Sequence, residues 1–211
     1  MNYYTSDLHF GQKSLLATGK YKERPFNTLE EMHKEMIDRW NKKVTNGDHV
    51  YILGDVGSRG VSNMHPEILA MLKGSKHLIL GNHDDVTDLR VRQQFIEICD
   101  RKMLSDNFEG TSYKLCLTHE PYMMWAGQHK GTIMLYGHLH NTTEEKLFQK
   151  YLAEFNQDNW KLKPNDQECI AYNVATCLWN YEPVSLKEIL KRKSIPETAL
   201  RKTDKKKEEK R

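Results

Sequence analysis

Short apolar runs alternate with longer amphipathic stretches in the first half of the chain. Residues 1–6, 50–53 and 77–80 are short and largely apolar, and the last two runs end at Gly54 and Gly81. A run of four to eight apolar residues that stops at a glycine is typical of a buried strand. Because the intervals between these runs have helical spacing, the pattern predicts an α/β fold.

The best-defined helix is expected to open at Thr28. Thr28 and Glu31 form a capping-box pattern, in which the hydroxyl and the carboxylate each satisfy a free backbone N–H of the first turn. Apolar residues then recur at helical spacing and form one inner face. They are Leu29, Met32, Met36, Ile37, Trp40 and Val44. Two further helices are predicted, over about residues 64–73 and 86–97.

The last two-thirds of the chain are richer in strands. Apolar runs predict three strands, and helical spacing predicts two helices. In chain order these elements span residues 113–118, 133–136, 143–157, 169–174 and 186–193. The chain has no internal repeat and no low-complexity linker before its charged end. We therefore predict one domain over residues 1–193, followed by a disordered tail over residues 194–211.

The composition is that of an ordinary globular protein and excludes several classes. The chain has 211 residues, 38% of them hydrophobic and 29% charged. Its mean hydropathy is -0.77. No apolar run approaches the roughly 20 residues of a membrane span, and the first residues lack a signal-peptide pattern. The four cysteines have no C-x-x-C spacing, which argues against disulfides and a structural zinc site. We expect a cytoplasmic protein without membrane association.

The formal net charge of +3 is unevenly distributed. Residues 187–211 contain 11 Lys/Arg and 5 Asp/Glu, a net +6, which leaves -3 for the rest of the chain. The tail is most simply a solvated end. An arm that binds nucleic acid is the less favoured alternative, since no aromatic residue lies among its charges. An oligomeric state does not follow from the pattern.

Polar clusters follow nearly every predicted strand. In chain order they are Asp7-Leu8-His9, Gly54-Asp55, Gly81-Asn82-His83-Asp84, His119 and Gly137-His138-Leu139-His140. The carboxyl ends of strands in an open α/β sheet converge on one crevice, so these clusters are expected to share a site. Their donors suit Mn, Fe, Co, Ni or Zn better than calcium. The clusters contain too many donor side chains for one tetrahedral zinc ion and about enough for two ions that share a carboxylate.

The ordered blocks D-x-H, G-D, G-N-H-[D/E], H and G-H-x-H resemble the signature of the calcineurin-like metallophosphoesterases. The resemblance covers roughly residues 1–185, and Arg24-Pro25-Phe26 and residues 181–186 look most like small bacterial and phage members. It implies two facing mixed β-sheets flanked by helices. It also implies the roles of the site residues: Asp7, His9 and His140 on one metal, Asn82, His119 and His138 on the other, Asp55 bridging both, and His83 facing the leaving group.

The resemblance implies a metal-dependent phosphoesterase. Two divalent cations contribute +4 and the ligands Asp7 and Asp55 return only -2, so the site attracts a phosphate ester. Two such ions hold a hydroxide near neutral pH, which attacks phosphorus in line. A protonated His83 then supplies the proton of the leaving alkoxide. Manganese is the favoured ion, and a phosphodiester or nucleotide is favoured over a monoester as substrate.

Two other functions are compatible with the blocks. A phage-type serine/threonine protein phosphatase is one, because the stretch after Asp55 keeps Arg59, although Ser58 stands where that class has an acid. Ser58 also stands where purple acid phosphatases have a tyrosine ligand, which argues against that class. The other alternative is a non-catalytic, metal-stabilised binding module.

Three residues are candidates for contacting the substrate. Arg59 and Arg24 can grip a phosphate oxygen, or each can be a solvated turn residue. Tyr122 can stack on a nucleobase, but packing of its own loop is the more common use of such a ring.

Overall fold

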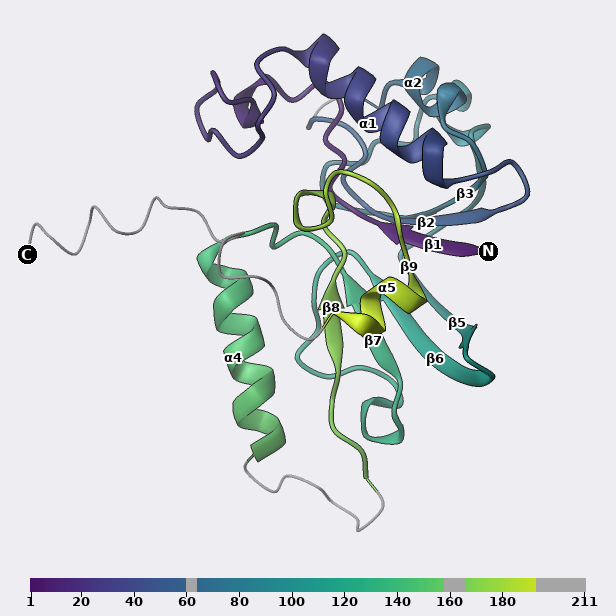
Figure 1. Cartoon of the computed structure of the whole chain (residues 1–211), viewed down its shortest axis with the longest axis vertical. Coiled ribbons are helices and arrows are strands. Elements are labelled where there is room, and N and C mark those ends of the chain that lie inside the picture. Colours follow the sequence, from purple (N-terminus) through teal and green to yellow (C-terminus); the bar gives the residue numbers. More distant parts are fainter. Residues whose placement is uncertain (60–63, 158–165, 193–211) are drawn as a thin grey trace, which may run out of the picture.

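Two mixed β-sheets face each other and carry helices on their outer sides (Figure 1). The computed structural model describes residues 1–59, 64–157 and 166–192. The predicted fold class, with two mixed sheets flanked by helices, is confirmed. Within the described ranges no helix is both long and apolar enough to span a membrane. The predicted tail over residues 194–211 lies outside the described residues.

The first sheet has five strands in the order β4-β3-β2-β1-β9. Four of them run parallel: β1 (Asn2–Thr5), β2 (His49–Leu53), β3 (Ser75–Ile79) and β4 (Phe95–Cys99). The two-residue strand β9 (Val184–Ser185) pairs antiparallel with β1. The carboxyl ends of the parallel strands therefore meet at one edge.

The second sheet has four strands in the order β5-β6-β7-β8. They are β5 (Arg101–Phe108), β6 (Thr111–Thr118), β7 (Ile133–Tyr136) and β8 (Ala171–Asn173). β5 and β6 form an antiparallel hairpin, whereas β6, β7 and β8 are parallel. An isolated parallel bridge between Ser6 and Ala175 joins the two sheets just beyond the ends of β1 and β8.

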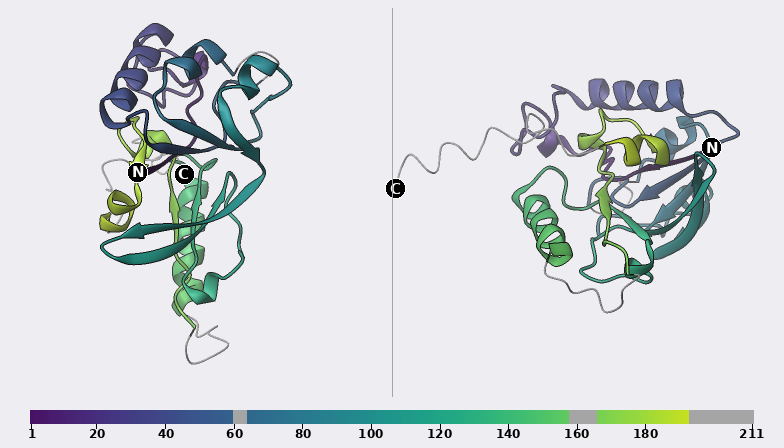
Figure 2. Two further views of the ribbon diagram at one scale, coloured as in Figure 1. Left: turned by 90° about the vertical axis from the view of Figure 1, so that its right-hand side faces the viewer. Right: turned by 60° about the horizontal axis from the view of Figure 1, so that its bottom comes forward.

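The helices cover the outer faces of the two sheets (Figure 2). α1 (Leu29–Lys43) and α2 (Pro66–Met71) lie over the first sheet, and α4 (Thr143–Gln157) lies against the second. α3 (Leu89–Arg92) precedes β4, and α5 (Leu186–Lys191) follows β9. Short 3-10 turns lie at Lys13–Leu15, Gln128–Lys130 and Thr176–Leu178.

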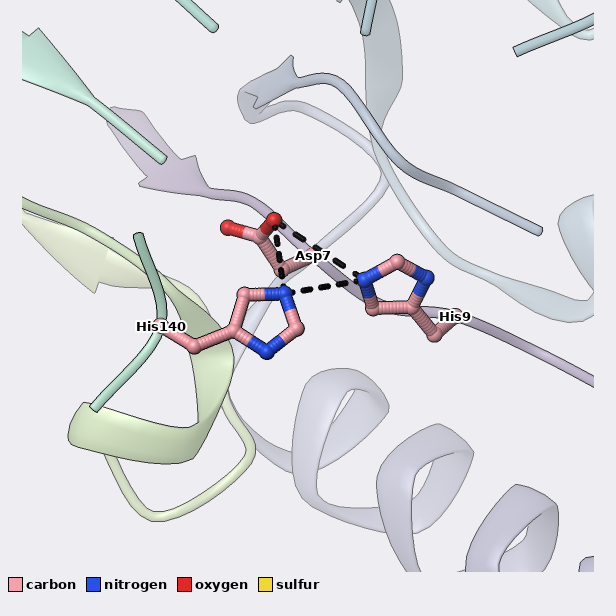
Figure 3. Close-up of side chains that lie close together, drawn as sticks. All are labelled: Asp7, His9 and His140. Atoms are coloured by element: carbon pink, nitrogen blue, oxygen red, sulfur yellow. Dashed lines mark hydrogen bonds and ion pairs between the residues drawn. The ribbon is translucent and has the colours of Figure 1, made fainter. Parts of the chain in front are cut away.

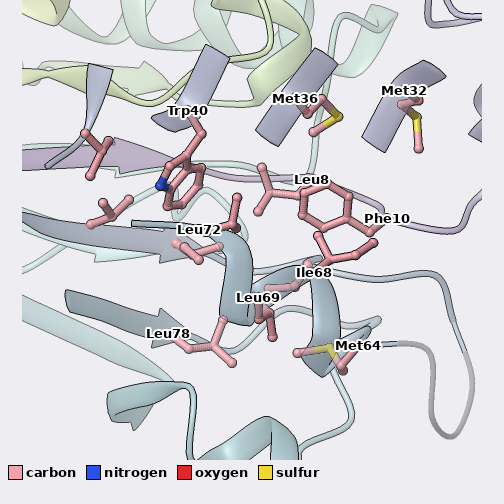
Figure 4. Close-up of a cluster of buried hydrophobic side chains, with 14 of the residues drawn as sticks. Leu8, Phe10, Met32, Met36, Trp40, Met64, Ile68, Leu69, Leu72 and Leu78 are labelled. Atoms are coloured by element: carbon pink, nitrogen blue, oxygen red, sulfur yellow. The ribbon is translucent and has the colours of Figure 1, made fainter. Parts of the chain in front are cut away.

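Helix α1 begins where the sequence predicts. The Thr28 side chain accepts a hydrogen bond from the Glu31 N–H at 3.1 Å, but the Glu31 carboxylate accepts from Asn27 N–H rather than from Thr28. Its inner face packs on β1, β2 and α2 around Trp40, which is fully buried (Figure 4). The Trp40 indole donates to the Lys73 carbonyl at 2.9 Å. Truncation of such a side chain to alanine costs about 3–5 kcal/mol.

A second apolar layer fills the space between the two sheets. It joins residues of the first sheet, such as Leu53 and Ile79, to residues of the second, such as Leu117 and Leu135. A third cluster packs α4 on the outer face of the second sheet, with Tyr136 against Phe148 at a ring-centroid distance of 5.2 Å. The loops that leave the carboxyl ends of both sheets are therefore anchored on buried strands.

The prediction of a helix over residues 86–97 is wrong. Only α3 is helical there, with Asp88 as its N-cap, and Phe95–Cys99 is the strand β4. The β-branched Ile96 and Ile98 favour an extended backbone, and parallel pairing with β3 decides the outcome.

The prediction from the sequence also missed β5, which spans Arg101–Phe108. Every second residue of β5 is partly buried, as expected for a strand. These partly buried residues include Lys102 and Asp106 as well as Leu104. Asp106 accepts a hydrogen bond from the Tyr4 hydroxyl at 2.6 Å. These polar residues hide the alternation of apolar residues that predicts a strand.

Candidate metal centre

The side chains predicted to form the site all follow the carboxyl ends of parallel strands. Asp7 and His9 follow β1, Asp55 follows β2, Asn82 and His83 follow β3, His119 follows β6, and His138 and His140 follow β7. Because these strands belong to both sheets and end at one edge, their loops meet there.

Five of these residues have a left-handed backbone that residues other than glycine seldom adopt. The angle φ lies between 46° and 67° at Asp7, His9, Asp55, His138 and His140. Such a conformation costs on the order of 1 kcal/mol or more for each residue and persists only where its surroundings fix it. Here hydrogen bonds between the loops fix the backbone. For example, the His9 N–H donates to the Asp55 carbonyl at 2.9 Å.

Asp7, His9 and His140 form the first group of donors (Figure 3). His140 Nε2 lies 3.2 Å from Asp7 Oδ1 and 3.0 Å from His9 Nε2. The third edge, from His9 Nε2 to Asp7 Oδ1, is 3.9 Å. Bonds of 2.0–2.2 Å to one ion place its ligand atoms about 3–3.5 Å apart. The group therefore has nearly the spacing that one divalent transition metal requires.

Asn82, His119 and His138 form the second group. Asn82 Oδ1 lies 3.0 Å from both His119 Nε2 and His138 Nδ1. These two ring nitrogens are 3.2 Å apart. This triangle is slightly tighter than the first, but it contains no carboxylate of its own.

Asp55 lies between the two groups. Its Oδ2 is 3.7 Å from His9 Nε2, and its Oδ1 is 3.4 Å from His119 Nε2. One carboxylate thus presents one oxygen to each group, which is the arrangement of a bridging ligand. Gly81 gives it room, since a Cβ at Gly81 would lie 2.6 Å from the Asp55 amide nitrogen.

Hydrogen bonds outside the site fix which nitrogen of three histidines faces inward. His9 Nδ1 lies 3.3 Å from the Gly57 carbonyl, and His119 Nδ1 lies 2.7 Å from the Leu53 carbonyl. Because a carbonyl only accepts, each Nδ1 is the donor and each Nε2 presents a lone pair to the site. His140 Nδ1 likewise faces Glu23 Oε2 at 3.0 Å. Neutral inward nitrogens are what a metal ion binds.

Asp7 and the neighbouring Glu23 favour positive charge on His140 of the first group. Burial raises the pKa of Asp7, but His140, His9 and His119 together lower it below its ordinary value. In the metal-free chain burial opposes protonation of His140, yet Asp7 and Glu23 raise its pKa to about 9. Burial lowers the pKa of His9 well below its ordinary value. A cation bound here would take the place of the His140 proton.

The comparison with known families decides the identity of the fold. The model of the calcineurin-like phosphoesterases matches residues 3–195. The chain belongs to this family. An uncharacterised protein of Methanocaldococcus jannaschii is 33% identical over 190 residues, which cover 90% of this chain and 89% of that protein. The gene 66 protein of Mycobacterium phage D29 is 27% identical over 161 residues, 66% of this chain and 78% of its own length.

A solved structure has the same fold. A protein of unknown function from Aquifex aeolicus superposes with a TM-score of 0.61 at 21% identity, over 90% of this chain and 98% of its own. The family match over residues 3–195 confirms the predicted resemblance to the calcineurin-like family.

A cavity of about 280 Å³ lies beside the two donor groups. His83 lines it together with Asp55. The ring of His83 stands edge-on to that of His9, with centroids 5.1 Å apart. His83 Nδ1 is buried and has no hydrogen-bond partner among the described residues. His83 thus faces the same space as the donors while its Nδ1 is uncommitted.

The three predicted substrate-contacting residues do not line this cavity within the described part of the chain. Arg24 is buried, and its guanidinium donates to the carbonyls of Asp7 and Leu8, both at 2.6 Å. Arg24 therefore neither lines the cavity as a phosphate ligand nor lies in solvent as a turn residue. Its guanidinium instead stabilises the loop that carries Asp7. Arg59 is exposed. Tyr122 is 37% exposed on the loop after His119.

Sequence reasoning gave no role to Glu23 and Asp84, which hold the site. The Asp84 carboxylate accepts hydrogen bonds from the N–H groups of Asp55, Val56 and Gly81 at 2.8–2.9 Å. It therefore ties the loop after β2 to the loop after β3. Asp84 is the fourth residue of the G-N-H-[D/E] block, so its role could have been predicted from the sequence. Glu23 lies in a loop that has no recognisable motif.

A buried polar network also reaches the site from α4. Glu145 is 1% exposed and accepts hydrogen bonds from the Tyr136 hydroxyl at 2.9 Å and from Asn173 Nδ2 at 2.9 Å. Asn173 Nδ2 also donates to the His140 carbonyl at 3.1 Å. Asn173 ends β8, so the rule that polar residues at strand ends belong to the site could have found it.

Proposed function

We propose that this chain is a metal-dependent phosphoesterase that holds two divalent transition-metal ions, with manganese as the favoured ion. Asp7, His9 and His140 would hold one ion, and Asn82, His119 and His138 the other. Asp55 would bind both. The observation that carries the proposal is the spacing of these seven side chains, with Asp55 within 3.7 Å of a histidine of each group.

The residues fit such ions in their chemistry as well as their spacing. Imidazole nitrogens, carboxylates and one amide oxygen suit Mn, Fe, Co, Ni or Zn. The fixed tautomers of His9 and His119 mean that no ring has to rotate before it binds. Bound ions would neutralise phosphate charge and make a water molecule a nucleophile near neutral pH.

His83 would act as the general acid in this mechanism. It lines the cavity next to Asp55, and its backbone N–H donates to Asp55 Oδ1 at 3.0 Å, which fixes its position relative to the donors. A protonated imidazole there can give its proton to the leaving oxygen of a phosphate ester.

Replacement of His83 tests this role. We expect His83→Ala to keep its metal content and to lose about 10²–10⁴-fold in turnover. The matched control is His65→Ala, which removes a histidine that pairs with Glu67 and does not line the cavity. Unchanged turnover in His83→Ala, with hydrolysis demonstrated in the unsubstituted chain, would contradict the assignment.

The activity itself is tested by a panel of esters with added Mn²⁺ or Ni²⁺. The panel contains an aryl monoester, an aryl diester, 2′,3′-cyclic nucleotides and a phosphopeptide. We expect hydrolysis that a chelator abolishes, with a diester or nucleotide as the fastest substrate. A phosphopeptide as the fastest substrate would instead indicate a protein phosphatase. Stoichiometric metal without any hydrolysis would indicate a metal-stabilised binding module.

A further inference from the structure

The cavity has a second wall that the metal donors do not use. Gln12, Leu15 and Tyr21, all from the segment after β1, line the cavity together with donors such as His138. With about 280 Å³, it has the size of the smallest ligand sites and has room for a phosphate and one compact organic group. This wall is therefore in the right place to contact the part of a substrate that is not phosphate.

Tyr21 provides an accessible aromatic ring at this wall. Its side chain is 49% exposed although it lines the cavity. The Lys20 ammonium lies over one face of the ring, 5.2 Å from the centroid. Beside it Leu15 is 2% exposed and gives the wall an apolar base. An exposed ring next to an apolar surface favours stacking of a second planar group, because this buries apolar area on both partners.

Gln12 provides a hydrogen-bond acceptor that has no partner. Its Oε1 is buried and unpartnered among the described residues, whereas its Nε2 donates to Ser14 Oγ at 3.4 Å. An unsatisfied buried acceptor is costly, so a residue that lines a cavity and carries such an atom is a candidate to accept a hydrogen bond from a ligand or a water molecule. A fully ionised phosphate monoester or diester has no proton to donate. Among the groups of a bound phosphate ester, only an N–H or O–H of the organic part can therefore donate to Gln12.

We propose that Gln12, Leu15 and Tyr21 form the subsite for the organic group of the substrate, and that this group is a nucleobase or its nucleoside. The planar heterocycle stacks on Tyr21, and an N–H or O–H donates to Gln12. The proposal rests on the proposed function in one respect, because it places the phosphate at the metal centre. It gives Tyr21 the stacking role that the sequence left open for Tyr122, since Tyr21 lines the cavity.

Binding of two phosphonates tests the subsite without any turnover. The probes are the phosphonate analogue of adenosine monophosphate and the corresponding phosphonate of ribose, titrated calorimetrically into the full chain with Mn²⁺. We expect the adenosine compound to bind about tenfold more tightly, the value of one stacked base. Tyr21→Ala should remove this advantage, and Tyr21→Phe should keep most of it. Gln12→Ala should reduce it several-fold.

Tyr122→Ala is the matched control, because Tyr122 is a partly exposed tyrosine that does not line the cavity. The melting temperature of each variant checks that the chain is folded. Equal affinity for both phosphonates, or an advantage that survives Tyr21→Ala but not Tyr122→Ala, would overturn the subsite. A chain that prefers the adenosine phosphonate but hydrolyses no ester keeps the subsite and loses only the proposed activity. A chain that hydrolyses esters without any preference for the base loses only the subsite.

Discussion

The two donor groups on either side of Asp55 differ in burial and in charge. In the first group Asp7 and His9 are almost completely buried, and a second carboxylate, Glu23, holds His140 at 3.0 Å. The second group is built from an amide oxygen and two imidazoles, and its amide residue, Asn82, is exposed. The two triangles have similar edges, so spacing alone does not distinguish them.

The difference indicates that the two groups bind cations unequally. Charged ligands in a buried site attract a divalent cation more strongly than neutral ligands near solvent. The first group also binds a proton when it has no metal, as the pKa of about 9 at His140 indicates. We therefore expect a tightly held ion at the first group and a more readily exchanged ion at the second.

Removal of the shared carboxylate should have the largest effect, because it acts on both groups. We expect Asp55→Ala to weaken both ions and to lower turnover by on the order of 10³-fold, since a bridging ligand serves both metals. Elemental analysis after dialysis, together with the ester panel, measures both effects. Retention of both ions by Asp55→Ala would show that Asp55 does not bridge.

A pair of single substitutions should affect the two groups separately. Glu23→Gln removes the carboxylate behind His140 and should weaken the tighter ion by about 10–100-fold, the usual effect of such an outer partner. Asn82→Ala should weaken the other ion and leave the tighter one unchanged. Calorimetric titration of each variant with Mn²⁺ separates the two. Equal weakening of both ions by each variant would contradict the division into two groups.

The smallest expected effect is a pH dependence that belongs to the first group alone. Although burial opposes protonation, Asp7 and Glu23 raise the pKa of His140 in the metal-free chain to about 9, above its ordinary value of about 6.5. The resulting stabilisation is complete below pH 6.5 and is lost as the pH rises through 9. The free energy of unfolding should fall in this window by on the order of 2 kcal/mol.

Denaturant unfolding of the metal-free chain from pH 6 to pH 10 measures this dependence. His140→Ala should flatten it, and His138→Ala should not. A slope that survives in His140→Ala would assign the titration to another group.

Much of the fold could be predicted because its signals are local. Buried strands such as β2 and β3 are apolar runs that end at a glycine, and α1 carries a helical face and an N-cap in its sequence. The expectation that Asp7, Asp55 and His138 meet required only that parallel strands end at one edge. In the structure the His138 N–H donates to Asp7 Oδ2 at 3.0 Å, and Asp55 Oδ2 lies 3.7 Å from His9 Nε2.

The rest depends on contacts that no local pattern records. β5 has Lys102 and Asp106 on its less exposed face, because Glu97 and Tyr4 on other strands supply their partners. The site of Arg24 is likewise set by two backbone carbonyls of a distant loop, so its burial could not be read from the residues around it. Tyr21 and Tyr122 both lie in loops, and the sequence does not tell which of them lines the cavity. The course of the two loops in the structure decides it.

The most direct test of the central claim is the number of ions that the chain binds. The metal-free full-length chain is titrated with Mn²⁺ by calorimetry near pH 7.5, and the bound metal is counted by elemental analysis after gel filtration. We expect two ions per chain that bind with clearly different affinities. A single ion, two ions of equal affinity, or no binding would contradict it.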